Sequence, residues 1–456
     1  MKSRQPRLVA LIWPLFLELW LGILVGLIGT ALAARVSDSA GASFALANHV
    51  FGTLFMLFRV IGAGISVVIT QCLGGQRRDE ADAVARTALG ASSWIGGISA
   101  VAALLGAEQL LRLVNAPAEV LPIAVPFLMA LAPSILFDAW NASMASVMRA
   151  HLHARDTLMV IVLMHLSHLL LALPLMSGWG PIPSLGLPGF AIAMAASRIL
   201  GVAMHLALWR WRLGLRPGLG DWWRLPRQQL GAILHIGLPG AAENLSWRLS
   251  FMVSVAAAGS LGALALATHA YVMQIMYWVL LFGAATGFAV EIVVGHLIGA
   301  GELHRAHQLV RKALARGLAV SFGMALIAAL SSHWLLSWFT QDPEILATGA
   351  TLLWITVLLE PGRTFNMVVI NALRAAGDAR YPVMAGAGSV LIVLAGGSWF
   401  FGVYLGWGLP GIWVAYTADE WIRGLLMWRR WARHDWVPYA RTTRRKLQRQ
   451  AAAPSA

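Results

Sequence analysis

The segment LIWPLFLE, residues 11–18, recurs in altered form as IGLPGAAE, residues 236–243. In both, a proline stands four positions before a glutamate, and the two prolines, Pro14 and Pro239, lie 225 positions apart. The same offset aligns further landmarks: Glu18/Glu243, Gly62/Gly287, Gly74/Gly299, Arg86/Arg311, Glu119/Glu344, Asn141/Asn366, Arg149/Arg374 and Arg155/Arg380. Matches between ionisable residues inside apolar stretches are unlikely to be chance. The chain is therefore predicted to contain two similar halves that run in the same direction.

The composition is that of a membrane protein. The chain is 59% hydrophobic and only 12% charged, whereas soluble domains are about 25% charged. Apolar stretches of about 20 residues, long enough to cross a bilayer, recur along the whole sequence. We predict spans at 8–34, 44–69, 84–106, 121–146, 157–176, 188–209, 232–258, 268–297, 310–331, 346–371, 383–402 and 409–428.

These spans predict an all-α membrane protein with twelve transmembrane helices in two six-helix lobes. The lobes comprise residues 1–213 and 232–433, joined by a polar linker at 214–231. Residues 434–456 are rich in arginine and are predicted to form a disordered basic tail. A parallel repeat in a membrane protein places a substrate path between its halves.

The basic residues predict the orientation. They gather in both tails and in every second loop, whereas the alternate loops hold only Arg35 and Arg112. Because lysine and arginine stay on the cytoplasmic side, both termini are expected in the cytoplasm. The net charge of +14 is then explained by contact with anionic membrane lipids rather than by nucleic-acid binding.

Several kinds of chemistry lack their sequence signals. Cys72 is the only cysteine, so neither an intramolecular disulfide nor a cysteine-based metal site is expected. His165 and His168 share one helix face, but no third metal ligand is evident, and no metal or other cofactor is predicted. The sequence shows no nucleotide-binding or metalloprotease motif. The protein is therefore not predicted to be an enzyme, and any pumping must draw on an ion gradient.

Ionisable residues inside the spans are the candidate functional groups, because each is expensive to hold in hydrocarbon unless it is paired or hydrated. The candidates for ion coupling are Glu18, Asp138, Glu243, Glu291 and Glu360, with Arg59, Arg248 and Arg363 as charge partners. Counted along the spans, Glu18, Arg59, Glu243 and Glu360 are expected near the middle of the membrane. Arg59 is the expected partner of Glu18.

Local pairing within one helix is the alternative for some of these groups. Glu360 and Arg363 stand three residues apart, and Asp419 and Arg423 stand four apart, so each pair can form within its helix. Polarisable and aromatic side chains are the candidates for a substrate cavity that accepts flat cations. They are Trp20, Trp140, Met144, Met273 and Trp278, together with the repeat-related amides Asn141 and Asn366.

Three stretches resemble the multidrug and toxic compound extrusion (MATE) family. The stretch from Gly64 to Gly75, ending TQCLGG, is similar to the signature after the second span, and GHLIGAG at 295–301 is its counterpart. The run that begins EPGR at 360–363 and continues as NALRAAGDAR at 371–380 resembles the motif of the tenth span in bacterial members. The resemblance implies a V-shaped pair of six-helix bundles in the bacterial inner membrane.

The resemblance also implies a function, namely export of organic drugs or toxins, expected to be cationic, in exchange for H⁺ or Na⁺, and the protein is expected to act as a monomer. Many bacterial members have an aspartate before a threonine in the first span, and this chain has Gly29 before Thr30. Coupling is then expected at Glu18 or in the second lobe. Two alternatives stay open: a lipid-linked oligosaccharide flippase of the same superfamily, and a multi-span protein that does not transport.

Overall fold

The computed structural model describes residues 8–114, 116–179 and 183–452, except for the side chains of residues 56, 57, 59–61 and 450–452. Over these ranges the chain is helical and contains no strand. The first half forms α1 (Leu8–Val36), α2 (Asp38–Gly74), α3 (Arg78–Leu105), α4 (Ala107–Leu113), α5 (Leu121–Ala150), α6 (Ala154–Ser177), α7 (Leu187–Leu208), η1 (Trp209–Leu213) and η2 (Leu219–Trp222). The second half forms α8 (Arg227–Ser260), α9 (Ala263–Ala300), α10 (Leu303–Leu330), α11 (Ser332–Ser337), α12 (Pro343–Ala375), α13 (Arg380–Ser389), η3 (Val390–Gly396), η4 (Ser398–Tyr404), α14 (Gly408–Ala432) and α15 (Val437–Ala452).

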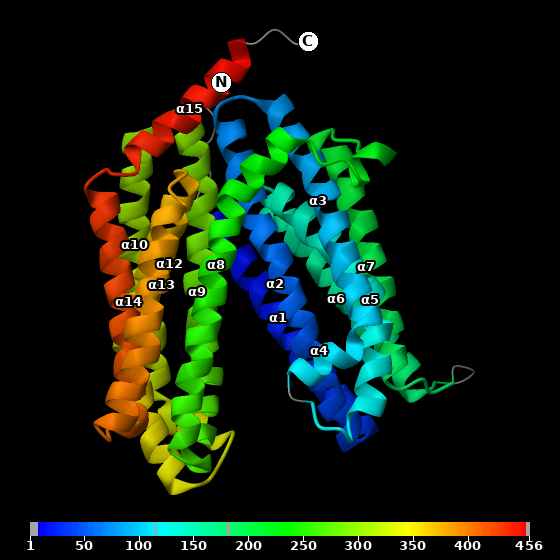
Figure 1. Cartoon of the computed structure of the whole chain (residues 1–456), viewed down its shortest axis with the longest axis vertical. Helices are drawn as coiled ribbons and strands as arrows, with labels where there is room; N and C mark the ends of the chain where they lie inside the picture. Colours follow the sequence, from blue (N-terminus) through cyan, green and yellow to red (C-terminus); the bar gives the residue numbers. More distant parts are fainter. Residues whose placement is uncertain (1–7, 115, 180–182, 453–456) are drawn as a thin grey trace. The chain divides into compact units, whose positions relative to one another are not determined.

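Each of the twelve predicted spans coincides with a helix (Figure 1). Nine helices in the described part of the chain are both long enough and apolar enough to cross a membrane. The other three predicted spans correspond to α2, α8 and α14, which have 37, 34 and 25 residues. At about 1.5 Å per residue, each of these is also long enough to cross the bilayer core. The predicted all-α membrane fold is confirmed.

The helices form two compact units, and three helices are shared between them. One unit comprises residues 17–69 and 78–237, and the other comprises residues 1–16, 70–77 and 238–456. Both repeat-related prolines, Pro14 and Pro239, lie within three residues of a point where the chain passes from one unit to the other. A proline inside a helix removes a backbone hydrogen bond and permits a bend. The proline repeat therefore marks equivalent places in α1 and α8.

An aromatic cluster forms the core of the unit that contains α3 to α7. The rings of Phe44, Phe127 and Phe190 have centroid separations of 4.9 to 6.2 Å, and all three side chains are buried. They come from α2, α5 and α7, which are distant in sequence. Edge-to-face and offset contacts at this distance stabilise a core beyond simple area burial.

The other unit contains a close crossing between the end of α2 and the end of α9. A Cβ atom on Gly74 would overlap the carbonyl oxygen of His296. A Cβ atom on Gly299 would in the same way overlap the carbonyl oxygen of Gln71. The 225-residue offset relates Gly74 to Gly299 and Gln71 to His296, so the two contacts are equivalent. The helices therefore cross on a local two-fold axis, which glycine allows by bringing the backbones together.

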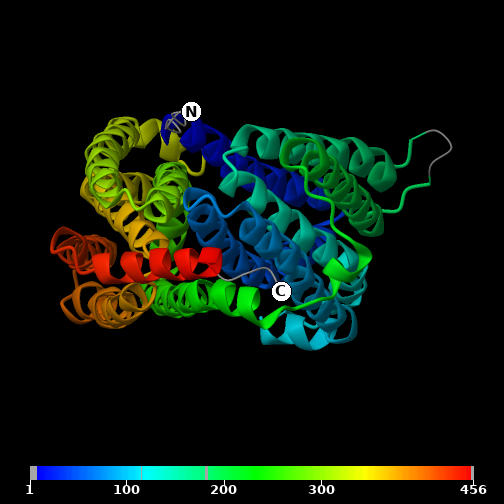
Figure 2. The ribbon, with the colours of Figure 1, turned by 90° about the horizontal axis from the view of Figure 1, so that it is seen from above.

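The basic tail was predicted to be disordered, but residues Val437–Ala452 form helix α15. This helix packs against α9 in the same unit (Figure 2). Its buried positions, Ala440 and Leu447, are separated by seven residues and lie on one face, a helical period that the high arginine content had concealed.

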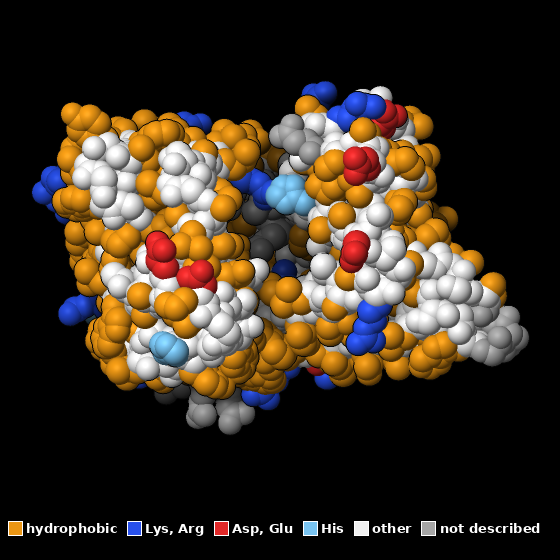
Figure 3. Space-filling model, turned by 90° about the horizontal axis from the view of Figure 1, so that it is seen from below, with side chains coloured by type: hydrophobic (Ala, Val, Ile, Leu, Met, Phe, Trp, Pro, Cys, Tyr) orange, Lys and Arg blue, Asp and Glu red, His pale blue; other side chains and the backbone are white. Residues whose placement is uncertain are grey.

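On the face shown in Figure 3, acidic and basic side chains are few and lie scattered among hydrophobic ones.

The glycine crossing leads to a stability prediction. We expect Gly299→Ala to lower the free energy of unfolding by about 1–3 kcal/mol, because the added methyl group must displace backbone rather than a flexible side chain. The measurement is the midpoint of thermal unfolding of the purified protein in detergent. Gly97→Ala in α3 is the control, since nothing lies within 4 Å of a Cβ there. Equal midpoints for the two variants would show that α2 and α9 do not touch at Gly299.

Candidate ion-coupling site

Two ion pairs repeat the internal symmetry of the chain. Glu18 Oε1 on α1 lies 2.6 Å from Arg149 Nη1 on α5. Glu243 on α8 is paired in the same way with Arg374 on α12. Both partners in one pair lie 225 positions from those in the other. The matched residues therefore make the same contact once in each half of the chain. Each pair joins the first helix of a half to its fourth predicted span.

These pairs bear on the expected partner of Glu18. Its described partner is Arg149, and the side chain of Arg59, the predicted partner, lies outside the described residues. Arg149 and Arg374 are in the last turns of α5 and α12. Each glutamate therefore meets an arginine at the end of the partner helix.

The first half also contains a balanced buried ion pair. Asp138 Oδ1 on α5 lies 2.7 Å from Arg198 Nε on α7, and both side chains are 7% exposed. The amide of Asn141 donates to the carbonyl of Arg198 over 2.9 Å, and its oxygen lies 3.0 Å from His205 Nδ1. One carboxylate thus meets one guanidinium, and Asn141 links α5 to α7 instead of facing a cavity.

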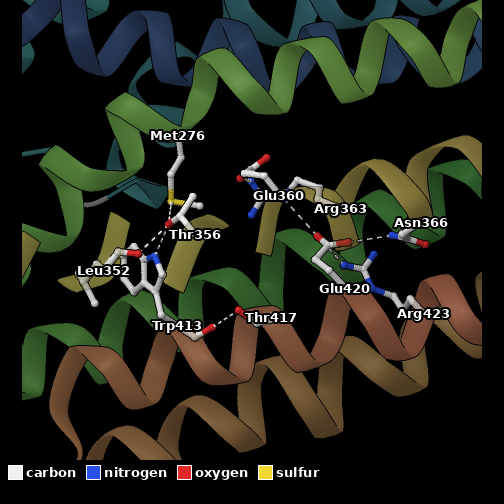
Figure 4. A network of polar contacts seen from close by, with 10 residues as sticks. All are labelled: Met276, Leu352, Thr356, Glu360, Arg363, Asn366, Trp413, Thr417, Glu420 and Arg423. Carbon is white, nitrogen blue, oxygen red and sulfur yellow. Dashed lines mark hydrogen bonds and ion pairs between the residues drawn. The ribbon is translucent and has the colours of Figure 1, made fainter. Parts of the chain in front are cut away.

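The second half builds a larger cluster at the equivalent place (Figure 4). Glu360 and Arg363 stand near the middle of α12, with Glu360 Oε1 2.6 Å from Arg363 Nη1. Glu420 on α14 lies 3.4 Å from Arg363 Nε and 2.9 Å from Arg423 Nη2 through its Oε1 atom. Its other oxygen accepts a 3.0 Å hydrogen bond from Asn366 Nδ2. The local Glu360–Arg363 pair is therefore one part of a network between two helices.

Asp419 completes this cluster. Its Oδ2 atom lies 2.7 Å from Arg423 Nη2, and its Oδ1 atom accepts a 2.6 Å hydrogen bond from Ser389 on α13. Glu360 and Asp419 are fully buried, and Glu420 is 6% exposed. Three carboxylates therefore share two guanidiniums. When all are ionised, the cluster carries one uncompensated negative charge.

The repeat shows how the charges of the two halves differ. Arg363 occupies the position of Asp138, 225 residues later, and the motif GLPG, at 186–189 and again at 408–411, places Glu420 at the position of Arg198. The acid and the base of this contact are therefore exchanged between the halves. The second half also adds a carboxylate at a position that is apolar in the first, since Glu360 corresponds to Ile135. The two halves share a frame but differ in charge.

Aromatic side chains surround a small cavity beside the cluster. It is lined by Trp247, Phe251, Arg363, Leu394, Tyr416 and Glu420. The ring of Phe251 stacks on Trp247, with centroids 5.1 Å apart, and lies 6.2 Å from Tyr416. The hydroxyl of Tyr416 accepts a hydrogen bond from Ser254 and lies 3.0 Å from His269 Nε2. A carboxylate beside aromatic faces is the chemistry that binds organic cations.

The other predicted site residues are dispersed. Glu291 is buried in α9, and Arg248 is half-buried in α8. Among the cavity candidates, Met144 is fully buried, Trp20 and Met273 are half-buried, and Trp278 is 49% exposed. Trp140 donates to Ser93 Oγ over 2.8 Å and packs on Trp222. Of the residues predicted for coupling, partnership or the cavity, the described contacts bring Glu360, Arg363 and Asn366 together in the cluster.

Sequence reasoning underrated the contribution of α14. Asp419 and Arg423 were predicted as a local pair, and that pair is present, but Glu420, an ionisable residue inside the same span, was not named as a coupling candidate. The spacing of three between Glu420 and Arg423 was the available signal. The contact between Glu420 and Arg363, 57 residues apart, had none. Within the described residues, no group of three metal-binding side chains comes together around His165 and His168.

Gly29 stands where the family resemblance implies an aspartate, and the structure fills this place with aromatic rings. A Cβ atom on Gly29 would lie 2.6 Å from Phe44 Cζ and 3.2 Å from Phe190. These rings belong to the aromatic core of their unit. A carboxylate at this position would therefore displace buried apolar groups, and the first half lacks both the acid and the space for it.

A duplicated bundle of apolar helices with charge clusters at its core defines a polytopic membrane transporter. The MatE family model matches the chain twice, over residues 14–174 and 239–398. The two matches begin 225 positions apart, so the repeat found in the sequence is the repeat of the family. The chain belongs to the MatE family, the MATE transporters that its motifs resemble, and this is a family of transporters rather than enzymes.

Relatives agree over nearly the full length. The chain is 31% identical over 430 residues to the uncharacterized transporter YisQ of Bacillus subtilis, covering 94% of each protein. It is 25% identical to the probable multidrug resistance protein NorM of Pseudomonas syringae pathovar tomato, covering 88% of this chain and 91% of that protein. The bent form of the Vibrio cholerae MATE transporter VcmN matches with a TM-score of 0.85 at 19% identity, over 96% of this chain and 97% of that one. This last likeness supports the fold.

The repeated ion pairs predict coupled effects on stability. We expect Glu243→Gln or Arg374→Gln alone to lower the free energy of unfolding by about 2 kcal/mol, between the values of exposed and of buried pairs. The second substitution should then cost less than the first, because the pair is already broken. Unfolding by SDS in mixed micelles measures all three variants. Additive losses of stability in the double variant would contradict the pairing. The exposed pair Glu108–Arg112, substituted in the same way, is the control.

Gly29→Asp tests whether the first half can hold an acid. We expect it to destabilise the protein by about 2–4 kcal/mol, since a polar group would be forced into the Phe44 contact without a partner. The midpoint of thermal unfolding is the measurement. Gly26→Asp, one turn earlier on α1 where nothing lies within 4 Å of a Cβ, is the matched control. Wild-type stability for Gly29→Asp would mean that the site is open.

Proposed function

We propose that this protein is a secondary active antiporter. It exports organic, mainly cationic, drugs or toxins in exchange for H⁺ or Na⁺ by alternating access. Its relatives include proteins named as probable multidrug resistance proteins. The positions of its basic residues support a bacterial inner-membrane location with both termini in the cytoplasm. No second subunit is needed for the proposed site, so a monomer is sufficient.

The single observation that carries this proposal is the excess of carboxylates in the second half. In the contacts of the described residues, Glu360, Asp419 and Glu420 share two arginines, Arg363 and Arg423. An uncompensated charge in a low-dielectric interior carries a penalty of several kcal/mol. A monovalent cation removes the imbalance, and H⁺, Na⁺ and an organic cation all qualify. Competition between the coupling ion and the organic cation for this one negative charge is the simplest basis for their exchange.

The geometry also suggests which groups exchange partners. Glu420 touches both arginines and lines the aromatic cavity with Trp247 and Tyr416. The cavity has a volume of only about 10 Å³ here, room for about one water molecule, so a cationic compound would be held by these rings, and attracted by the excess charge, in a state that widens it. When H⁺ or Na⁺ neutralises Glu360, that attraction weakens and the compound leaves. The ion can shift the conformational equilibrium only by its different affinity for the two states.

The first half is a poorer candidate for coupling. Its buried pair, Asp138 and Arg198, is balanced one to one, and aromatic rings occupy the space beside Gly29. Glu18 is held by an arginine at a helix end, as is its counterpart in the second half, Glu243. These four groups are better suited to hold the bundles together than to bind an ion.

A lipid-linked oligosaccharide flippase is the second candidate. Binding a pyrophosphate-linked lipid favours a strongly cationic site, whereas the cluster described here is acidic in excess. The charge balance therefore favours the export of cations. Complementation of a flippase-deficient strain tests the flippase function directly.

Transport by inside-out vesicles tests the proposal. Vesicles from an efflux-deficient bacterium that expresses the chain are given either an acidic interior or a Na⁺-rich interior, and ethidium uptake is followed. We expect one gradient to drive uptake, and Glu360→Gln to slow it by about tenfold or more, within the range of coupling energies. Glu108→Gln, an exposed glutamate on α4, should transport at the wild-type rate.

Each alternative outcome has a definite meaning. Uptake that needs neither gradient would contradict antiport. Wild-type uptake by Glu360→Gln would contradict coupling at the second-half cluster while leaving the export function intact. Absence of uptake under both gradients, with the protein present in the vesicles, would contradict the export of this class of cation.

A further inference from the structure

Helix α15 is anchored at its start by a tryptophan stack. Trp436, immediately before the helix, lies parallel to Trp431 of α14 with centroids 4.3 Å apart, and its Nε1 atom donates to the Trp431 carbonyl over 3.0 Å. Tyr439 accepts a 3.3 Å hydrogen bond from Arg430. These contacts attach the first turn of α15 firmly to the end of α14.

The other end of α15 reaches three helix ends in the same unit. Arg444 lies against Gly301, which ends α9. Thr443 approaches Gly377, just beyond α12, where a Cβ atom would lie 3.2 Å from its hydroxyl. Leu447 is 8% exposed and lies over Gly75, the residue after α2. The helix therefore spans from α14 to the ends of α9, α12 and α2.

The contact with α2 has both an apolar and a polar part. A Cβ atom on Gly75 would lie 3.1 Å from Leu447 Cδ1. Arg77 Nη1 donates a 3.2 Å hydrogen bond to the carbonyl of Leu447, in the last turns of α15. Since that carbonyl is near a helix terminus, a cationic donor is favoured there. Leu447 is thus the point where α15 holds the end of α2.

The place where α15 binds is next to the glycine crossing. Gly74 and Gly299 bring α2 and α9 together one residue before Gly75 and two before Gly301. Residues 70–77 of α2 belong to the same compact unit as α9, α12 and α15, although most of α2 belongs to the other unit. Because α15 covers the ends of both α2 and α9 at this crossing, it opposes the separation of the two helices.

We propose that α15 is a strap that keeps the end of α2 closed against α9 and thereby favours the state in which this crossing is shut. The inference rests on the proposed alternating-access function, in which ends such as these must part and meet. The strap acts through Leu447 and its contact with Gly75, while the arginine-rich outer face of α15 keeps the helix in water. Releasing the strap shifts the population toward the open crossing.

The chain contains its own reporter for this crossing. Cys72 is the only cysteine, it lies in the segment 70–77, and it is 2% exposed. A thiol in this position reacts with a maleimide only when the end of α2 becomes accessible. The labelling rate of Cys72 in the intact protein therefore measures opening of the crossing without any need for transport.

The experiment compares two aspartates on adjacent positions of α15. Full-length protein in lipid nanodiscs is labelled with a fluorescent maleimide, with complete labelling in SDS as the reference. We expect Leu447→Asp to raise the labelling rate about tenfold, because it removes a buried leucine contact. Gln448→Asp adds the same charge one residue later at an exposed position and should label within about twofold of the wild type.

A second variant keeps the test decisive if Leu447→Asp fails to fold. Leu447→Ala removes part of the contact without adding charge, and we expect a smaller rise of about threefold. Wild-type labelling rates in both Leu447 variants would overturn the strap, as would an equal rise in Gln448→Asp. The ethidium assay separates the two proposals: faster labelling of Leu447→Asp in a protein that transports nothing supports the strap and contradicts the antiporter.

Discussion

A charge inside an apolar bundle must meet an opposite charge, and this constraint organises the whole molecule. The chain has few charged residues, yet it places carboxylates and guanidiniums in the interior of both units. Several of the pairs join helices that are far apart in sequence, such as α1 with α5 and α12 with α14. Because separating such a pair in a low-dielectric interior is costly, these pairs fix which helices are neighbours.

Duplication explains both what the halves share and how they differ. The pairs Glu18–Arg149 and Glu243–Arg374 are preserved in both halves, as expected for contacts that hold the bundle together. The charges at mid-helix are not preserved. One half keeps a balanced pair, and the other combines three acids with two bases. A repeated frame with one unbalanced site gives two similar halves different charge.

The close approach of α2 and α9 depends on a different physical rule. Glycines let two backbones touch, and repeat symmetry requires the contact to occur twice, once from each helix. In a membrane, where no hydrophobic driving force brings helices together, such small-residue contacts are a principal source of association. Helix α15 then covers the ends of this crossing, so the glycine pair and the strap form one structural region.

The sequence determined the class and frame of the protein. Hydropathy fixed the twelve spans, because each must cover the same bilayer thickness, and the 225-residue offset fixed the two halves. It also identified Glu360, Arg363 and Asn366, since acids and amides in apolar helices are rare. The amphipathic face of α15 was present in the sequence too, but its arginines masked a spacing of seven between Ala440 and Leu447.

Only the tertiary structure decided which charges meet. Helical spacing predicts partners three or four residues away, but it contains no information about a neighbouring helix. Hence the contact of Glu18 with Arg149 was not predicted, and the contact between Glu420 and Arg363 could not be foreseen. The same holds for Gly29, whose neighbours Phe44 and Phe190 come from other helices. Membrane crossing is a property of each segment, whereas charge pairing is a property of how the segments pack.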